Sequence, residues 1–341
     1  ALYAPGLGYY SAGSSKFGEA GDFITAPEIS PLFSQCVANQ CAEILPAIQQ
    51  PMIIEVGAGR GTMAADILLQ LEQLNRLPKQ YMILELSADL RQRQQQTLEQ
   101  RCPHLLHHVS WLDSLPDKIS AIILANELLD ALPVHRICHS ESGVQEQYVT
   151  MQADRFGWAQ DTLSDQRLNK IEAKEWPQGY CSEINLAATD WIQAWGDRLE
   201  QGVMLLIDYG FPRHEFFHPQ RVDGTLMCHY RHRAHDDPFV YPGLQDITAH
   251  VDFTSIAEAA LSADLSVSGY TTQAMFLMAN GLESLLSEQG ELPQREQLIL
   301  SQQVKKLTLP GEMGELFKVM ALSKQYNEPL RGFAHDMRGR L

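Results

Sequence analysis

The feature that most constrains this chain is a short apolar strand that runs directly into a loop of three glycines. Pro51 precedes the apolar run 52–56, the loop 57–61 has glycine at every second position, and an apolar helical face begins at Met63. A backbone that turns sharply and closely approaches a ligand needs glycine, because a Cβ would block it. The pattern predicts a strand, a ligand-binding loop and a helix in a doubly wound α/β sheet.

The spacing of the glycines distinguishes between two cofactors. The loop reads G-x-G-x-G, with Glu55 two residues before the first glycine, whereas the dinucleotide fingerprint G-x-G-x-x-G would place glycine or alanine at Thr62. The loop therefore favours S-adenosylmethionine over NAD. An ordinary strand-to-helix turn is the alternative for the glycines alone.

A second buried-strand pattern at 81–86 supports this interpretation, because Glu85 lies near its carboxyl end. An acid about 20 residues beyond the glycines accepts ribose hydroxyls in nucleotide-binding units. A solvated strand end is the alternative for Glu85 alone. A third strand, 107–111, is expected to end beside the adenine. The predicted cofactor-binding residues are Glu55, Gly57, Ala58, Gly59, Gly61, Thr62, Glu85, Leu86, Ser87, Leu112, Asp113 and Asn126.

Polar residues follow the clearest strand of the sequence, 121–125. Asn126, Glu127 and Asp130 come directly after it, and residues just past the carboxyl end of a central strand face the crevice in which open α/β sheets bind ligands. A helix cap with acids in its first turn is the alternative. A further buried strand, 203–207, ends at Asp208 in the same way.

Composition limits the function classes. The 341 residues are 45% hydrophobic and carry a net charge of −16, which argues against nucleic acid and favours a basic protein or peptide as partner. No apolar run approaches the roughly 20 residues that span a bilayer, and the first residues lack a signal-peptide pattern, so a cytoplasmic protein without membrane insertion is expected. Six scattered cysteines without a C-x-x-C pair predict reduced thiols and no disulfide. Six histidines in 214–250 lack the context of a zinc site, so no metal is expected.

The chain divides into a Rossmann-like core with insertions. Residues 1–50 are expected to form a loop and a helix at 31–45, and the core comprises 51–133 and 186–210. Insertions at 134–185 and 211–250 form a substrate-binding lobe, with a β-hairpin around Gly143, and 251–341 complete the core with an antiparallel or edge strand at 317–322. The polar loop 18–28 is a candidate lid, and a plain surface connection is its alternative. The residues assigned to the lid or substrate are Asp22, Phe23, Thr25, Pro27, Glu28 and Tyr209.

These motifs resemble the MidA-type family (DUF185) of S-adenosylmethionine-dependent methyltransferases, which includes the mitochondrial complex I assembly arginine methyltransferase. The resemblance spans nearly the whole chain. It rests on Gly8-Tyr9-Tyr10, the loop 21–28, the three-glycine loop, Ala125-Asn126-Glu127, Asp130-Ala131-Leu132-Pro133, Asp208-Tyr209-Gly210, Gly224-Thr225-Leu226, His232, His235-Asp236, Pro242-Gly243, the run 246–253 and the run 313–319. Ala58 departs from the proline of many relatives, and Ala88 departs similarly.

The resemblance implies a class I methyltransferase fold, S-adenosylmethionine as cofactor with S-adenosylhomocysteine as product, and methylation of an arginine on a respiratory complex I subunit. A guanidinium is protonated and delocalised, and flanking carboxylates can bind it and localise its charge. The catalytic candidates are Glu127 and Asp130, followed by Asp208 and His235. A homodimer is a further expectation. Two alternatives stay open: a methyltransferase for another protein or small-molecule acceptor, and an assembly factor that binds cofactor without turnover.

Overall fold

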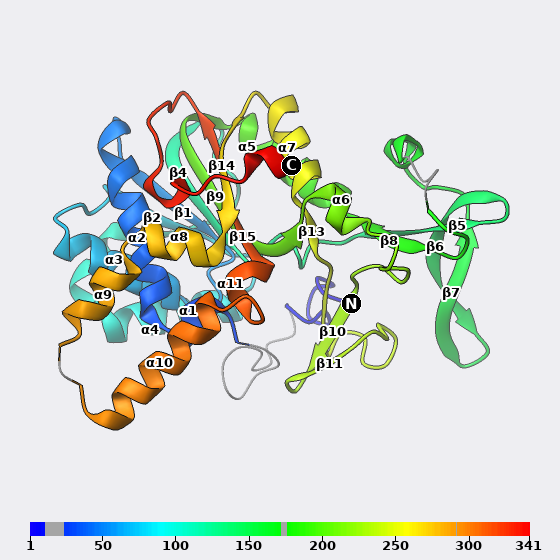
Figure 1. Ribbon diagram of the computed structural model, residues 1–341, viewed down its shortest axis with the longest axis horizontal. Helices are drawn as coiled ribbons and strands as arrows, with labels where there is room; N and C mark the ends of the chain where they lie inside the picture. The colour runs from blue at the N-terminus through cyan, green and yellow to red at the C-terminus, as the bar shows by residue number, and fades with distance from the viewer. Residues whose placement is uncertain (11–23, 172–175, 291) are drawn as a thin grey trace.

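The computed structural model describes residues 1–10, 24–171, 176–290 and 292–341. Within these ranges an eight-stranded sheet forms the centre of the molecule, in the order β14-β15-β9-β4-β1-β2-β3, with β13 beside β9 (Figure 1). Its strands are β1 (Met52–Val56), β2 (Gln80–Leu84), β3 (Val109–Leu112), β4 (Ile119–Asn126), β9 (Leu199–Phe211), β13 (Val251–Asp252), β14 (Ser266–Thr272) and β15 (Phe317–Lys324).

Most of this sheet is parallel, and β15 is the exception. β1 pairs in parallel with β2 and β4, and β4 pairs in parallel with β9. β15 runs antiparallel to both β9 and β14, so it lies inside the sheet rather than at an edge. The predicted doubly wound sheet with an antiparallel C-terminal strand is confirmed, and of the two alternatives given for 317–322, an edge strand or an antiparallel strand, the antiparallel one is correct.

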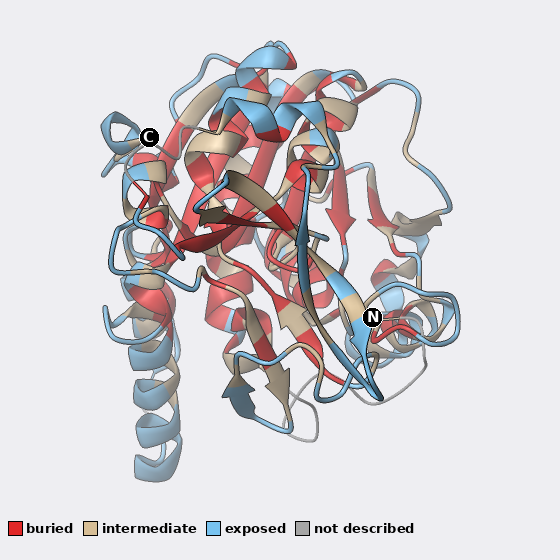
Figure 2. Cartoon of the chain, turned by 90° about the vertical axis from the view of Figure 1, so that its right-hand side faces the viewer, coloured by how far each residue is buried: buried red, intermediate tan, exposed pale blue. Residues whose placement is uncertain are grey.

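Helices cover both faces of the sheet because alternate strand residues point to opposite sides. Ile53 packs in the apolar cluster that includes α2, α3 and α8, whereas Ile54 packs in the cluster with α5 and α7. Figure 2 shows that burial is concentrated on the strands between these layers. The helices of the two layers are α2 (Pro31–Ile44), α3 (Thr62–Gln73), α4 (Ala88–Arg101), α8 (Gln273–Ala279) and α9 (Leu282–Glu288), then α5 (Leu186–Gly196) and α7 (Phe253–Ser262).

Local sequence signals explain where several helices begin and end. The side chain of Ser30 accepts a hydrogen bond from the Leu32 N–H, as expected for the cap of α2. Gly281, with φ of +89°, separates α8 from α9. The remaining helices are α1 (Ala26–Ile29), α6 (Arg213–Phe216), α10 (Gln294–Thr308), α11 (Met313–Leu316) and the 3₁₀ turns Leu45–Ala47, Pro103–His108, Gln166–Lys170, Arg331–Phe333 and Arg338–Arg340.

Two smaller sheets interrupt the core. The segment between β4 and α5 forms a four-stranded sheet, β7-β6-β5-β8, which projects from the core in Figure 1, and the segment after β9 forms the sheet β11-β10-β12. The predicted hairpin is present as β5 and β6 and is extended by two further strands. Their bounds are β5 (His135–Ser140), β6 (Gly143–Gln152), β7 (Arg155–Asp161), β8 (Cys181–Ile184), β10 (Met227–Tyr230), β11 (Arg233–His235) and β12 (Asp246–Thr248).

The prediction of no disulfide is wrong, because Cys138 and Cys181 are bonded to each other. The two cysteines are 43 residues apart in the sequence, with Cα atoms 4.1 Å apart. Antiparallel pairing of β5 with β8 places them directly opposite each other. The bond depends on strand register, which cysteine spacing in the sequence does not show. The other four cysteines are free and buried.

No helix in the described part of the chain is long and apolar enough to cross a membrane.

Candidate functional site

The three glycines of the loop between β1 and α3 adopt backbone conformations that side chains rarely allow. Gly57, Gly59 and Gly61 have φ angles of +68°, +52° and +82°. A Cβ at Gly59 would meet no atom within 4 Å, so this backbone borders open space. The Gly57 N–H donates to the Leu84 carbonyl at 3.0 Å, which ties the loop to β2. The loop is therefore a fixed cradle whose backbone a ligand can approach closely.

The open space is a cavity of about 700 Å³ at the carboxyl ends of β1, β2 and β4. A cavity of this size holds a cofactor-sized ligand. Most of the predicted cofactor-binding residues line it, whereas Gly61, Leu112 and Asp113 do not. The lining residues include Glu55, Gly57, Ala58, Gly59, Thr62, Glu85, Leu86, Ser87 and Asn126, together with Tyr3, Tyr10, Thr25, Pro27, Glu28, Glu127, Leu128, Leu132 and Trp191.

Glu85 lies just beyond β2 and is held in place by two donors. Its Oε1 accepts from the Ser87 N–H at 2.9 Å, and its Oε2 accepts from Gln94 Nε2 at 3.1 Å. Burial raises the pKa of Glu85. Gln94 Nε2 also donates to the Gly59 carbonyl at 3.0 Å, so one amide links the acid to the glycine loop. Gln94 was missed because nothing in a glutamine-rich helix distinguishes it from its neighbours.

Two residues predicted to bind the cofactor, Glu55 and Asp113, form a hydrogen bond or an ion pair with other side chains of the protein. The Glu55 carboxylate accepts from the Tyr81 hydroxyl at 2.6 Å, and burial raises the pKa of Glu55 to about 7. Asp113 is largely exposed and forms an ion pair with Arg91 at 2.7 Å. Glu55 therefore supports the loop from inside the sheet, and Asp113 lies outside the cavity lining.

Glu127 faces the cavity from the loop that follows β4. Its φ of +49° is unusual for a residue with a side chain. Its Oε1 accepts from the Ala26 N–H at 3.3 Å and from Asn126 Nδ2 at 3.2 Å. Burial, and next the charge of Asp130, raise the pKa of Glu127 to about 8. Among the described residues the buried Oδ1 of Asn126 has no hydrogen-bond partner, so it can accept from a ligand.

Asp130, Asp208 and Tyr209 lie behind this loop rather than in the cavity lining. Asp208 Oδ2 accepts from the N–H groups of Leu129 and Asp130, at 2.9 and 3.2 Å. The Tyr209 hydroxyl donates to Asp130 Oδ2 at 2.6 Å. Burial raises the pKa of both aspartates. Their geometry fixes the loop that presents Glu127.

Of the other predicted residues, some line the cavity and some do not. His235 lies on β11, where its Nδ1 accepts from the Asp237 N–H at 3.3 Å, outside the cavity lining. Thr25, Pro27 and Glu28 line the cavity, and Glu28 accepts from the Thr62 hydroxyl at 2.8 Å. Asp22 and Phe23 lie outside the described residues.

The N-terminal segment contributes lining residues that the sequence did not reveal. Tyr3 and Tyr10 line the cavity that Glu127 also lines. The Tyr10 hydroxyl donates to Asp246 Oδ1, 236 residues away, at 2.9 Å. Only a contact between residues far apart in the sequence brings the two together, and no local sequence pattern indicates it.

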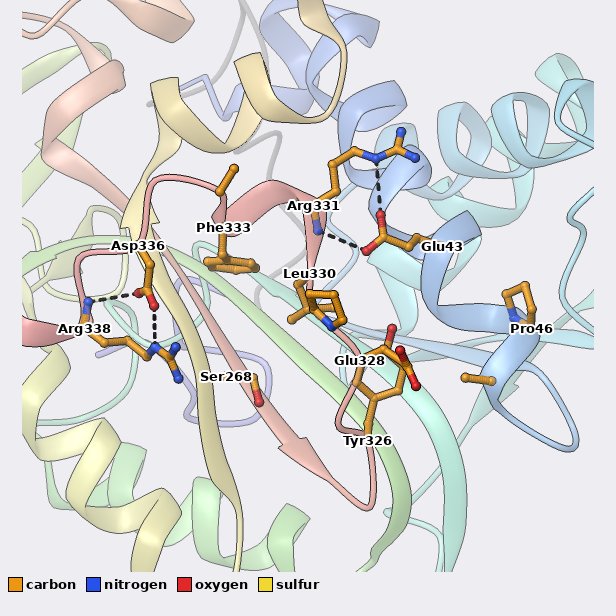
Figure 3. Close-up of a pocket in the computed structure, with 13 residues that line it drawn as sticks. Glu43, Pro46, Ser268, Tyr326, Glu328, Leu330, Arg331, Phe333, Asp336 and Arg338 are labelled. Carbon is orange, nitrogen blue, oxygen red and sulfur yellow. Dashed lines mark hydrogen bonds and ion pairs between the residues drawn. The ribbon is translucent and has the colours of Figure 1, made fainter.

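A second depression, of about 900 Å³, lies near the C-terminus (Figure 3). Four of its charged residues form two ion pairs, Arg331 with Glu43 at 3.2 Å and Arg338 with Asp336 at 2.6 Å. It has no glycine loop. The functional site is therefore assigned to the smaller cavity. Among the described residues, no group of three His, Cys, Asp or Glu side chains is placed to hold a metal ion.

This fold and site are those of a class I S-adenosylmethionine-dependent methyltransferase. The glycine cradle, Glu85 and the acceptor oxygen of Asn126 fit the methionine and adenosine parts of that cofactor, which offer an amino group and ribose hydroxyls as donors.

Comparisons with known proteins agree. A family model described as S-adenosyl-L-methionine-dependent methyltransferase matches residues 36–271. Mouse protein arginine methyltransferase NDUFAF7, mitochondrial, is 31% identical over 94% of this chain and 78% of its own length, and the human protein is 29% identical over 94% and 77%. A COG1565 superfamily structure from Burkholderia thailandensis, bound to S-adenosylhomocysteine, is 43% identical with a TM-score of 0.94, covering 100% of this chain and 90% of its own. The chain belongs to the MidA-type family of S-adenosylmethionine-dependent methyltransferases, and the predicted cofactor is confirmed.

Proposed function

We propose that this protein transfers a methyl group from S-adenosylmethionine to an arginine side chain of a protein, a respiratory complex I subunit or its bacterial counterpart. The observation that carries the proposal is Glu127, whose carboxylate borders the cavity beside the glycine loop. The names of the mouse and human relatives support arginine as the acceptor. The family resemblance of the sequence supports complex I.

The two ends of the cavity have different roles in this proposal. The cofactor end is lined by Gly57, Gly59 and Glu85, and the acceptor end by Glu127 and Tyr10. S-Adenosylmethionine supplies an electrophilic methyl group on a sulfonium and leaves as S-adenosylhomocysteine. At the cofactor end, the glycine backbone admits the ligand closely, Glu85 accepts ribose hydroxyls, and Asn126 Oδ1 accepts from an amino group.

At the acceptor end, Glu127 binds the guanidinium and orients it. A carboxylate bound to two N–H groups draws the positive charge toward them, which leaves the third nitrogen better able to attack. That nitrogen forms a bond to the methyl carbon and releases one proton, so the methylated guanidinium keeps its charge. Asp130 lies behind Glu127, and its charge adds negative potential for a cation. Alignment and exclusion of water supply the remaining rate acceleration.

Calorimetric titration with S-adenosylmethionine and with NAD tests the cofactor, and mass spectrometry of complex I subunits incubated with protein and methyl donor tests the acceptor. We expect binding of the methyl donor alone and an added methyl mass on an arginine. Binding with transfer to another residue or to a small molecule would replace the acceptor. Binding without transfer to any acceptor would favour an assembly factor.

A further inference from the structure

Two tyrosines of the N-terminal segment form a stacked pair in the lining of the cavity. The rings of Tyr3 and Tyr10 are nearly parallel, with centroids 5.5 Å apart and an angle of 20° between their planes. Tyr9 is buried and contacts the Tyr10 ring edge-on at 5.1 Å. Both members of the pair line the cavity that Glu127 also lines. A fixed aromatic surface therefore borders the same cavity as that carboxylate.

Hydrogen bonds from both hydroxyls hold this pair against the core. Tyr10 donates to Asp246 Oδ1 at 2.9 Å, and Tyr3 donates to the Ala131 carbonyl at 2.8 Å. Asp246 is buried on β12, and Ala131 belongs to the loop that presents Glu127. Burial, and next the charge of Asp246, raise the pKa of Tyr10, so its hydroxyl keeps the proton that it donates. Because the hydroxyls are anchored, the ring positions are set before any ligand arrives.

The electrostatics of this end favour a cation. The charges of Asp130 and Asp246 both act on Glu127 and on Tyr10. The only basic side chain among the described lining residues is Arg60, which belongs to the glycine loop. A guanidinium is planar and weakly hydrated, and it stacks on an aromatic face more readily than an ammonium does. A negative field beside an aromatic surface therefore suits arginine better than lysine.

We propose that the Tyr3–Tyr10 pair determines the acceptor specificity of this methyltransferase: the guanidinium of the acceptor stacks on the tyrosine pair while Glu127 binds its N–H groups. Asp246 acts through Tyr10 and is a positioning residue. This inference rests on the proposed function and deepens it, because it names the cavity residues that select arginine.

Binding of small probes tests this without a known protein substrate. N-acetyl-arginine methylamide, its lysine counterpart and its citrulline counterpart are titrated separately into protein saturated with S-adenosylhomocysteine, with saturation-transfer NMR as the readout. Citrulline has the shape of arginine without its charge. We expect the arginine probe to bind most tightly, the lysine probe less tightly and the citrulline probe least tightly. Tyr10→Leu should weaken arginine binding about 5- to 30-fold, the range of a desolvated cation–π contact, and shrink the arginine preference.

Two milder variants and a control complete the test. Tyr10→Phe and Asp246→Asn should each weaken arginine binding about 2- to 5-fold, and the double variant no further, because both break one hydrogen bond. The control is Tyr148→Phe, which also breaks a hydrogen bond between a tyrosine and a carboxylate, here Glu146 at 3.0 Å. Tyr148 lies outside the cavity lining, so this variant should leave the affinity for all three probes unchanged. S-Adenosylhomocysteine affinity should stay constant throughout.

Three outcomes would overturn the inference: equal binding of arginine and citrulline to the unmodified protein, an unchanged arginine preference in Tyr10→Leu, or an equal loss in Tyr148→Phe. These outcomes are distinguishable from failure of the proposed function. If the probes bind in the predicted order but mass spectrometry finds no methylated arginine, the recognition of arginine by the tyrosine pair is supported and the proposed reaction is contradicted. If arginine is methylated but Tyr10→Leu keeps the preference for the arginine probe, the proposed reaction is supported and the tyrosine pair does not determine its specificity.

Discussion

At the cofactor end of the cavity most residues come from one continuous unit, in which β1, the glycine loop, α3 and β2 lead to Glu85, and Asn126 at the end of β4 is the exception. The acceptor end joins residues 1–10, the loop after β4, and β12. The cofactor end depends on backbone conformation, which local sequence encodes. The acceptor end depends on side-chain contacts over more than a hundred residues of sequence. The first can be shared by many methyltransferases, and the second can change with the substrate.

Removing the carboxylate at the acceptor end is expected to have the largest effect. Glu127→Gln keeps the shape of the side chain but loses the charge that binds a guanidinium. We expect methyl transfer to fall about 10²- to 10⁴-fold, while S-adenosylmethionine affinity changes less than about twofold. A labelled-methyl transfer assay and calorimetry measure the two quantities.

Glu99→Gln, at an exposed position of α4, is the control for loss of one negative charge and should behave like the unmodified protein. If Glu127→Gln weakened cofactor binding as much as it slowed transfer, the separation of the two ends would be wrong.

A side chain in the glycine cradle should act on the cofactor end alone. Valine at Gly59 would carry a Cβ at a φ of +52° and fill the space that the ligand approaches. We expect Gly59→Val to weaken S-adenosylmethionine binding about 100-fold, or roughly 2.7 kcal/mol. Gly143→Val introduces a similar strain, at φ of +103° in the β5–β6 hairpin, and should leave cofactor affinity unchanged. Equal losses in both variants would point to general destabilisation.

The pH dependence of transfer should report on the acceptor end. Burial raises the pKa of Glu127 to about 8, so below that value the carboxyl is mostly neutral and cannot bind a cation. We expect kcat/KM to rise about tenfold per pH unit up to about pH 8 and then to level off. In Glu127→Gln this rise should disappear. A rate that falls between pH 6 and 8 would contradict the assigned role.

A smaller effect is expected from the contact that joins α1 to the cofactor end. Glu28 accepts a hydrogen bond from the Thr62 hydroxyl at 2.8 Å, which holds α1 against the start of α3. Glu28→Ala and Thr62→Val should each speed dissociation of S-adenosylhomocysteine about fivefold, measured by stopped-flow. The double variant should show no further loss if the two side chains act as one contact. Additive effects would mean that each touches the ligand separately.

The smallest effect on the cavity is expected from loss of the disulfide, which should change stability instead. Closing a 43-residue loop stabilises a fold by about 4 kcal/mol in the chain-entropy account. Cys138→Ser should therefore lower the free energy of unfolding of the β5–β8 sheet and leave cofactor affinity unchanged. Thiol titration of the unfolded chain should find four reactive cysteines without reductant and six with it. Six without reductant would show that the bond is absent in solution.

The parts of the fold that sequence predicts are those with local causes. The strand 52–56, the helix behind Ser30 and the turn at the glycines follow from periodicity, capping and the conformational freedom of glycine. Glu85 and Glu127 could be named because the carboxyl ends of parallel strands lie at one edge of the sheet, and β2 and β4 both pair in parallel with β1.

The missed features have long-range causes. Tyr10 reaches Asp246 over 236 residues, and Cys138 meets Cys181 through the pairing of β5 with β8. Asp130 and Asp208 were candidates for chemistry, yet their hydrogen bonds are made to the protein itself. A sequence shows that such groups exist, but only the fold shows what they face.

The most direct test of the account is a crystal structure of this protein with a compound in which adenosine is linked through its 5′ position to an alkylguanidine. The account predicts ribose hydroxyls on Glu85, the linker beside Gly59, and the guanidinium within hydrogen-bond distance of Glu127 and against the Tyr10 ring. An adenosine bound away from Glu85, or a guanidinium that leaves Glu127 without a contact, would contradict it.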